Sequence, residues 1–288
     1  MHARIEHVSV GRDRFAYLAR GPETGPLVLC LHGFPDAPPS LLPLLDELAR
    51  AGYRAVAPWL RGYDPSTLAG PYGPVPLGAD ALTLASALAP GRRPYLVGHD
   101  WGAVAVYIAA SLAPSRIAAA VAMAIPHPAA LARALPRHPT QFARSAYIAA
   151  IQFPWLPERA LTAAGGALLR QIWRLWSPGI QVPVELEREI ARCLKASIPA
   201  PLAHYRALKR PHQLAALFRD TDPIRVPTLQ LHGARDGCFS AALGDHQAHH
   251  FAADHSFELV HDAGHFLHVE SPETVSRAVL AWLEAHPQ

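Results

Sequence analysis

The residues best suited to covalent chemistry form the pentapeptide Gly98-His99-Asp100-Trp101-Gly102, which lies between a predicted strand and a predicted helix. A residue on so sharp a turn is held in strained backbone geometry, and small residues two positions before and after it prevent clashes between strand and helix. Gly98 and Gly102 meet this spacing. The carboxylate of Asp100 predicts a nucleophile that displaces a leaving group at carbon and forms an alkyl ester. The alternative is that Asp100 only caps the following helix.

A base for hydrolysis of such an ester is available in the segment Ala263-Gly264-His265-Phe266, which follows another predicted strand. An imidazole base needs a carboxylate that fixes its tautomer and stabilises the imidazolium. Asp236, at the end of the preceding predicted strand, is the expected partner of His265. Asp262, three residues before the histidine, is the competing candidate, but neighbours on a turn seldom face each other well.

The elements that must position these side chains alternate between strand and helix, which predicts a mostly parallel sheet flanked by helices, an α/β fold. Short apolar runs indicate buried strands, and segments with helical spacing follow them. The predicted strands are 27–31, 54–57, 94–97, 117–125, 228–231 and 257–260, and the predicted helices are 41–51, 103–112 and 272–285. Ligands of open α/β sheets bind at the carboxyl ends of the strands, where all three candidate residues are expected.

The alternation stops between residues 127 and 212. This stretch has helical spacing over 144–151, 158–176, 185–195 and 201–209, and no segment in it favours a strand. We therefore expect a core of residues 1–126 and 213–288 with an inserted all-helical lid, residues 127–212, over the carboxyl edge of the sheet. The aromatic residues Phe153, Trp155, Trp173 and Trp176 of the lid predict an apolar pocket.

On these motifs the sequence resembles the α/β-hydrolase superfamily, and most closely its epoxide hydrolase branch, over nearly the whole chain. His32-Gly33-Phe34-Pro35-Asp36 is similar to the H-G-x-P loop of that family, and Arg61-Gly62-Tyr63 to its R-G-Y turn. Residues 98–102 match its G-H-D-W-G elbow. Two positions depart from the pattern: Trp59 stands where an aspartate commonly precedes the R-G-Y turn, and Asp64-Pro65 replaces the glycine after it.

The resemblance implies hydrolysis of an apolar epoxide to a vicinal diol. Asp100 would attack an epoxide carbon, and His265, held by Asp236, would activate the water that hydrolyses the ester. Tyr147 and Tyr205 are similar to the two lid tyrosines of the family and would hydrogen-bond the ring oxygen. The alternative for each tyrosine is an aromatic ring that packs on the core.

The resemblance also implies an oxyanion hole made of the backbone N–H groups of Phe34 and Trp101. The nearest alternative function is a haloalkane dehalogenase, which shares the Asp-His-Asp triad and a tryptophan after the nucleophile. Phe34 occupies the position where that family commonly has a halide-binding asparagine, which counts against this alternative. A second alternative is a ligand-binding protein that keeps the fold without catalysis.

Charge and composition limit the partners of the chain. The net charge is only +3, from 26 Lys and Arg against 23 Asp and Glu, and no basic run indicates nucleic-acid binding. The apolar runs are too short to span a bilayer. We therefore expect a small apolar epoxide and water as partners and no nucleic acid or membrane, while the oligomeric state is left open.

Cysteine and histidine patterns bear on cofactors and on the compartment. Cys30, Cys193 and Cys238 are widely spaced, which predicts free thiols in a reducing compartment, and the start of the chain lacks a secretory pattern, so a cytoplasmic location is expected. His246, His249 and His250 have helical spacing and could form a metal-binding face, although a solvated polar face is favoured. The expected chemistry needs no metal or organic cofactor.

Overall fold

An eight-stranded sheet forms the centre of the molecule in the computed structural model, which describes residues 4–163, 166–218, 221, 223–244 and 246–288. The strand order is β1-β2-β4-β3-β5-β6-β7-β8. β1 (Ile5–Val10) and β2 (Asp13–Arg20) pair in antiparallel fashion, as do β2 and β4, whereas all later pairs are parallel. The predicted mostly parallel α/β sheet is confirmed.

The six predicted strands form the parallel part of the sheet. They are β3 (Leu27–Leu31), β4 (Arg54–Pro58), β5 (Tyr95–His99), β6 (Ala120–Met123), β7 (Thr228–Gly233) and β8 (His255–Val260). The prediction of a strand over 117–125 was too long. Ala124 has a φ of +67°, which ends β6, and the N–H of Ala118 bonds to the carbonyl of Pro94, before β5 begins.

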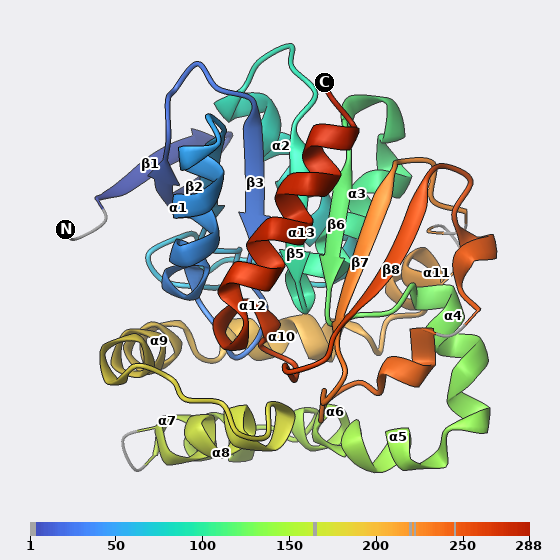
Figure 1. Ribbon diagram of the computed structural model, residues 1–288. Coiled ribbons are helices and arrows are strands. Elements are labelled where there is room, and N and C mark those ends of the chain that lie inside the picture. The colour runs from blue at the N-terminus through green and yellow to red at the C-terminus, as the bar shows by residue number, and fades with distance from the viewer. Residues whose placement is uncertain (1–3, 164–165, 219–220, 222, 245) are drawn as a thin grey trace.

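Helices cover both faces of the sheet (Figure 1). α1 (Leu42–Arg50), α12 (Leu267–Glu270) and α13 (Pro272–Ala285) lie on one face, and α2 (Pro74–Leu88) and α3 (Trp101–Leu112) on the other. Sequence analysis missed α2, which begins with two prolines. It also missed the two antiparallel strands: β1 is a half-exposed edge strand without a continuous apolar run, whereas the buried apolar run of β2, residues 15–18, was overlooked.

Within the described part of residues 127–212, every regular element is helical, as predicted. The helices are α4 (Pro128–Ala134), α5 (Pro139–Arg144), α6 (Ala146–Ile151), α7 (Leu156–Thr162), α8 (Ala167–Trp176), α9 (Val184–Ser197) and α10 (Ala200–Ala207), and α11 (Pro211–Phe218) follows. Figure 1 shows α5 to α10 gathered below the carboxyl ends of the strands, and α4 and α11 higher, at the side of β8 in this view.

Two details of the lid differ from the sequence expectation. The helix expected over 158–176 is divided into α7 and α8, and residues 164 and 165 between them lie outside the described part of the chain. The predicted lid boundary at residue 212 falls inside α11. The N-terminal residues 1–3 also lie outside the described part.

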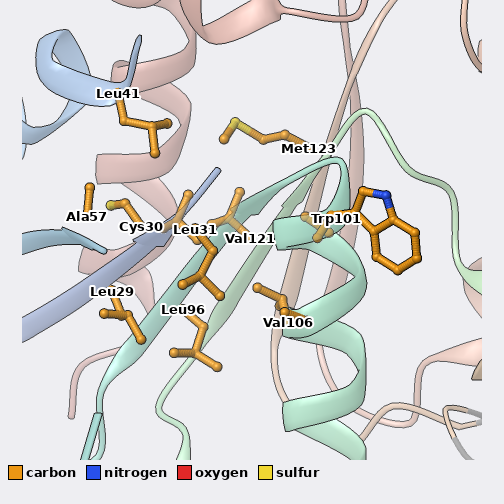
Figure 2. Packing of buried hydrophobic residues seen from close by; sticks show 14 of the residues in the cluster. Leu29, Cys30, Leu31, Leu41, Ala57, Leu96, Trp101, Val106, Val121 and Met123 are labelled. Carbon is orange, nitrogen blue, oxygen red and sulfur yellow. The ribbon is translucent and has the colours of Figure 1, made fainter. Parts of the chain in front are cut away.

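The hydrophobic core around β3, β5, β6 and α3 holds in place the carboxyl edge of the sheet, where the candidate functional residues lie. Figure 2 shows Leu31 of β3 and Leu96 of β5 on the side of the sheet that faces Val106 of α3, and Val121 of β6 on the opposite side. All four side chains are buried. Burial of apolar surface contributes about 25 cal/mol per Å², so a cluster of this size holds β5 and α3 firmly on either side of the turn between them. None of the described helices meets the length and hydropathy needed to cross a membrane.

Candidate active site

Asp100 stands alone between the last residue of β5 and the first residue of α3, as the elbow motif predicts. Its backbone has a φ of +52°, a conformation that few residues other than glycine adopt. A Cβ atom at Gly98 would lie 2.2 Å from the carbonyl oxygen of Gly102, and one at Gly102 would lie 2.1 Å from the carbonyl oxygen of Leu31. The two glycines are therefore required by close backbone contact, which keeps Asp100 on a sharp turn above the sheet.

The carboxylate of Asp100 is buried and points toward the loop after β3. Its Oδ1 accepts a hydrogen bond from the backbone N–H of Phe34 at 2.8 Å. A Cβ atom at Gly33 would lie 2.3 Å from the Cβ of Asp100, so the glycine of the H-G-x-P loop allows this approach. The side chain makes no capping bond to α3, so the helix-cap alternative is not realised.

His265, Asp236 and Asp100 are brought together from three different strand ends. The Nδ1 atom of His265 lies 2.9 Å from Oδ2 of Asp236, and its Nε2 atom lies 3.5 Å from Oδ2 of Asp100. The other oxygen of Asp236 accepts the N–H groups of Cys238 and Phe239 at 2.7 and 2.8 Å. The alternative acid, Asp262, is exposed to solvent and lies near Arg235.

The two carboxylates control the charge of His265. Burial alone would lower the pKa of its imidazole, but Asp236 and Asp100 together outweigh burial and raise the pKa to about 10. At neutral pH His265 is thus an imidazolium between two carboxylates. This charge state depends on Asp100 remaining ionised, since loss of one negative charge removes part of the stabilisation.

Tyr147 of α6 and Tyr205 of α10 meet above Asp100. Their ring centroids lie 5.8 Å apart, and both side chains line the same cavity as the carboxylate. The hydroxyl of Tyr147 lies 3.7 Å from Sγ of Cys238. Burial, with the charge of Asp100 adding to it, raises the pKa of both phenols well above the usual value, so both are protonated donors.

The cavity has a volume of about 230 Å³ and a mostly apolar wall. Among the described residues that line it, Asp100 carries the only formal charge. Its apolar lining comes chiefly from the lid, from α11 and from the start of α3, and includes Val104, Leu131, Leu135, Phe142, Ile148, Leu208, Leu217 and Phe218. The predicted apolar pocket is therefore present, but different aromatic residues line it. Phe153 and Trp155 are exposed on the outside of the lid, so their assignment to the pocket was wrong.

Trp173 and Trp176 of α8 support the site from behind, a role that sequence analysis missed. The indole N–H of Trp173 donates to the carbonyl of Pro35 at 2.9 Å, next to the Phe34 amide. The ring of Trp176 lies 5.2 Å from that of His265, and its carbonyl accepts the backbone N–H of His265 at 3.1 Å. The only sequence signal for this role was the helical spacing of Trp173 and Trp176 in α8, which is typical of a buried helix face.

Three further histidines, His249, His250 and His268, are held in hydrogen-bonded clusters. His268 is buried, and its Nε2 lies 3.1 Å from Oδ2 of Asp36, which also accepts the hydroxyl of Ser40. His249 and His250, weighed above as metal ligands, instead have their Nε2 atoms 2.9 and 3.2 Å from a guanidinium nitrogen of Arg133. A guanidinium at these nitrogens opposes a bound cation. The expected solvated polar face is present only in part, because His246 and His249 are exposed but His250 is fully buried.

Known proteins share both the sequence pattern and the fold. The family model for the alpha/beta hydrolase fold matches residues 26–272. Epoxide hydrolase 3 of Xenopus tropicalis is 31% identical over 94% of this chain and 75% of its own length, and epoxide hydrolase A of Mycobacterium tuberculosis is 28% identical over 94% of both. A solved structure of a putative epoxide hydrolase from Klebsiella pneumoniae is 26% identical, with a TM-score of 0.82 over 97% of both chains.

Proposed function

This chain belongs to the α/β-hydrolase fold family and is related to epoxide hydrolases, and we propose that it converts an apolar epoxide to a vicinal diol through an ester formed on Asp100. The observation that carries the proposal is the meeting of two protonated phenols with an aspartate nucleophile in one apolar cavity. An epoxide needs a nucleophile on one side and an acid on its oxygen on the other. Tyr147 and Tyr205 supply the acid.

The first step opens the ring. A carboxylate oxygen of Asp100 attacks an epoxide carbon, the carbon–oxygen bond breaks, and its electron pair goes to the ring oxygen. That oxygen stays attached to the substrate, so it takes a proton from a tyrosine hydroxyl as the charge develops. The phenol becomes a phenolate, and Asp100 becomes a neutral hydroxyalkyl ester.

The second step hydrolyses the ester. Since Asp100 no longer carries a charge, the pKa of His265 falls and its imidazolium releases a proton to solvent, which it recovers when Asp100 is ionised again at the end of the cycle. The neutral imidazole, still held by Asp236, then accepts a proton from water. The hydroxide attacks the ester carbonyl, and the Phe34 N–H, together with the Trp101 amide, binds the oxyanion. Collapse expels the diol, which takes the proton of the imidazolium, and Asp100 returns its acid proton to the phenolate.

The cavity limits the substrate class. Among the described residues that line the cavity, none is cationic and Asp100 is the only charged one, so an epoxide that bears a carboxylate would have no cationic partner in the wall. The apolar wall favours an aliphatic or aromatic substituent. The two steps use residues of the chain and water alone.

The proposal extends to the organisation and location of the protein. We place the lid from residue 127 to the end of α11, since a boundary at 212 would cut that helix. Cys30, Cys193 and Cys238 are free cysteines, which supports a reducing compartment such as the cytoplasm.

The test is to trap the ester. The variant His265→Gln lacks the base and is incubated with a styrene-type epoxide and a 1-haloalkane, and its intact mass is measured. We expect a gain equal to the whole epoxide on the peptide that contains Asp100. A gain of the alkyl group alone would indicate a haloalkane dehalogenase instead.

The control is the double variant Asp100→Asn with His265→Gln, which should form no adduct. Near-ultraviolet circular dichroism shows whether each variant is folded. A folded His265→Gln variant that forms no adduct with either compound, while the wild-type protein turns neither over, would overturn the proposed function and favour the ligand-binding alternative.

A further inference from the structure

Apolar side chains are exposed along the outer side of the lid, and we propose that this surface docks on an anionic lipid bilayer, which departs from the sequence expectation that no membrane is a partner. We call it the lid face and define it by Phe142, Ala146, Ala149, Ala150, Phe153, Trp155 and Leu156. In Figure 1 it belongs to α5, α6 and the start of α7, which lie along the edge of the molecule opposite the body of the sheet. Its docking does not depend on the proposed catalytic chemistry.

The lid face is an apolar stripe that points away from the core. Phe142, Ala146 and Ala149 follow one another at intervals of four and three residues, which places them on one side of the α5–α6 segment, and Phe153 follows two residues after α6 ends. All four are exposed. On the inner side, the polar side chain of Gln141 is buried and donates to the carbonyl of Cys238 at 2.7 Å. The segment thus turns a polar residue inward and apolar residues outward.

The largest side chains of the lid face are strongly exposed. The exposed fractions are 60% for Phe142, 63% for Phe153, 74% for Trp155 and 69% for Leu156. Single exposed apolar residues are common, but a contiguous group of this kind marks an interaction surface. Tryptophan and phenylalanine are also the side chains that favour the interface of a bilayer.

The distribution of charge identifies the partner. Residues 128–218 contain 12 Lys and Arg but only 4 Glu, a net charge of +8, whereas the rest of the chain has 14 basic against 19 acidic residues, a net charge of −5. Exposed Arg144, Arg159 and Arg174 are on the helices of this region. An anionic surface would attract the lid and repel the core, which orients the lid face toward it.

The same charge opposes a symmetric dimer through the lid face. A two-fold interface places the same patch of both copies together, so two regions of net charge +8 would meet. Interfacial binding to lipid instead pairs basic side chains with anionic headgroups and places the aromatic side chains at the acyl boundary.

Docking would place the entrance of the cavity at the bilayer. Phe142 belongs to the lid face and also lines the cavity that contains Asp100. An apolar epoxide dissolved in the membrane could therefore enter beside this ring without crossing water. This consequence, unlike docking itself, rests on the proposed function.

Cosedimentation with vesicles tests the proposal on the full-length wild-type protein. We expect binding to phosphatidylcholine vesicles that contain about 30 mol % phosphatidylglycerol, and binding at least about tenfold weaker to phosphatidylcholine alone or at high salt. Trp155 is the most exposed tryptophan, so its fluorescence should shift to the blue on binding, and Trp155→Phe should reduce the shift.

Variants assign the binding to the lid face. The double variant Phe153→Ala with Trp155→Ala should weaken binding about tenfold, and Arg159→Gln should weaken it to a smaller, salt-sensitive extent. The matched control is Leu112→Ala on α3 of the core, where Leu112 is 54% exposed, and its binding should equal that of the wild type. Turnover of a water-soluble epoxide by these variants reports separately on the proposed function.

Three results would overturn the proposal. They are absence of binding to anionic vesicles, binding that Leu112→Ala weakens as much as the lid-face double variant does, and a lipid-free dimer that this double variant abolishes. Light scattering of the wild-type protein without lipid detects the last. Because cosedimentation needs no turnover, a protein that binds vesicles but forms no ester would leave docking supported and the catalytic proposal refuted.

Discussion

At the scale of single residues, the two lid tyrosines distinguish epoxide opening from the other reactions that the proposed Asp-His-Asp triad could catalyse. If their hydroxyl groups donate to the ring oxygen, Tyr147→Phe and Tyr205→Phe should each slow ester formation by about 10²-fold. Each tyrosine substitution is made in the His265→Gln variant, which cannot hydrolyse the ester. The intact mass after rapid mixing then measures ester formation alone. Tyr95→Phe is the control, since its hydroxyl bonds to the carbonyl of His286 near the C-terminus. Unchanged ester formation in both variants would show that the phenols only pack.

The charge of His265 links the site to stability. Its pKa of about 10 in the folded protein exceeds the usual value of 6.5, so between these pH values the folded state holds a proton that the unfolded state lacks. The stabilisation is therefore complete below about pH 6.5 and is lost as pH rises toward 10. Urea unfolding should show a larger loss of stability from about pH 7 to 8.5 in the wild type than in His265→Gln.

Comparison of the wild type with His265→Gln separates the effect of His265 on stability from the effects of other titrating groups. Burial raises the pKa of Cys30, Cys193 and Cys238, which also reduces stability with rising pH, but this effect is common to both proteins and cancels in the difference. Equal slopes of stability against pH in the two proteins would contradict an imidazolium held between Asp100 and Asp236.

At the scale of elements, α8 fixes the loop that carries the Phe34 amide. Trp173 donates to the carbonyl of Pro35 and stacks on Phe266 with ring centroids 4.1 Å apart. Trp173→Phe keeps an aromatic ring but leaves a buried carbonyl unsatisfied, so we expect a loss of about 1–3 kcal/mol in the free energy of unfolding. Because the Phe34 amide is adjacent, ester hydrolysis should also slow. Urea unfolding and single-turnover kinetics measure the two effects.

A matched tryptophan substitution on another element controls for the change in ring size. Trp282 of α13 is part-buried, and its indole nitrogen has no hydrogen-bond partner among the described residues. Trp282→Phe thus loses no hydrogen bond and should cost less stability than Trp173→Phe. An equal cost for both would mean that the bond to Pro35 does not stabilise the loop.

At the scale of the whole molecule, the lid is bonded into the core at several separate points. Nε2 of His204 lies 2.9 Å from the carbonyl oxygen of Arg61, Ser197 accepts the N–H of Asp64 at 2.8 Å, and Trp176 accepts the N–H of His265. We therefore expect core and lid to unfold together, with coincident transitions by far-ultraviolet circular dichroism and by tryptophan fluorescence. Two separated transitions would show that the lid unfolds independently.

The sequence by itself determined the parallel part of the sheet and pointed to three residues that the fold brings together. Buried parallel strands are continuous apolar runs, which can be recognised locally, and Asp100, Asp236 and His265 each follow such a run on a turn. The edge strand β1 escaped because a half-exposed strand lacks that run, and β2 was missed although its residues 15–18 form a short buried apolar run. The lid tyrosines could be named only through the family resemblance, since one tyrosine on a helix resembles any other.

Tertiary structure alone decided which side of each lid helix meets the core. Helical spacing shows that a segment has two faces but not which face is covered, because that depends on elements distant in the chain. Phe153 and Trp155 were therefore assigned to the pocket, yet they point outward, while Trp173 and Trp176 of α8 pack behind His265 and the Phe34 loop. Local pattern thus placed the reacting groups, and long-range packing determined what surrounds them and which surface faces solvent.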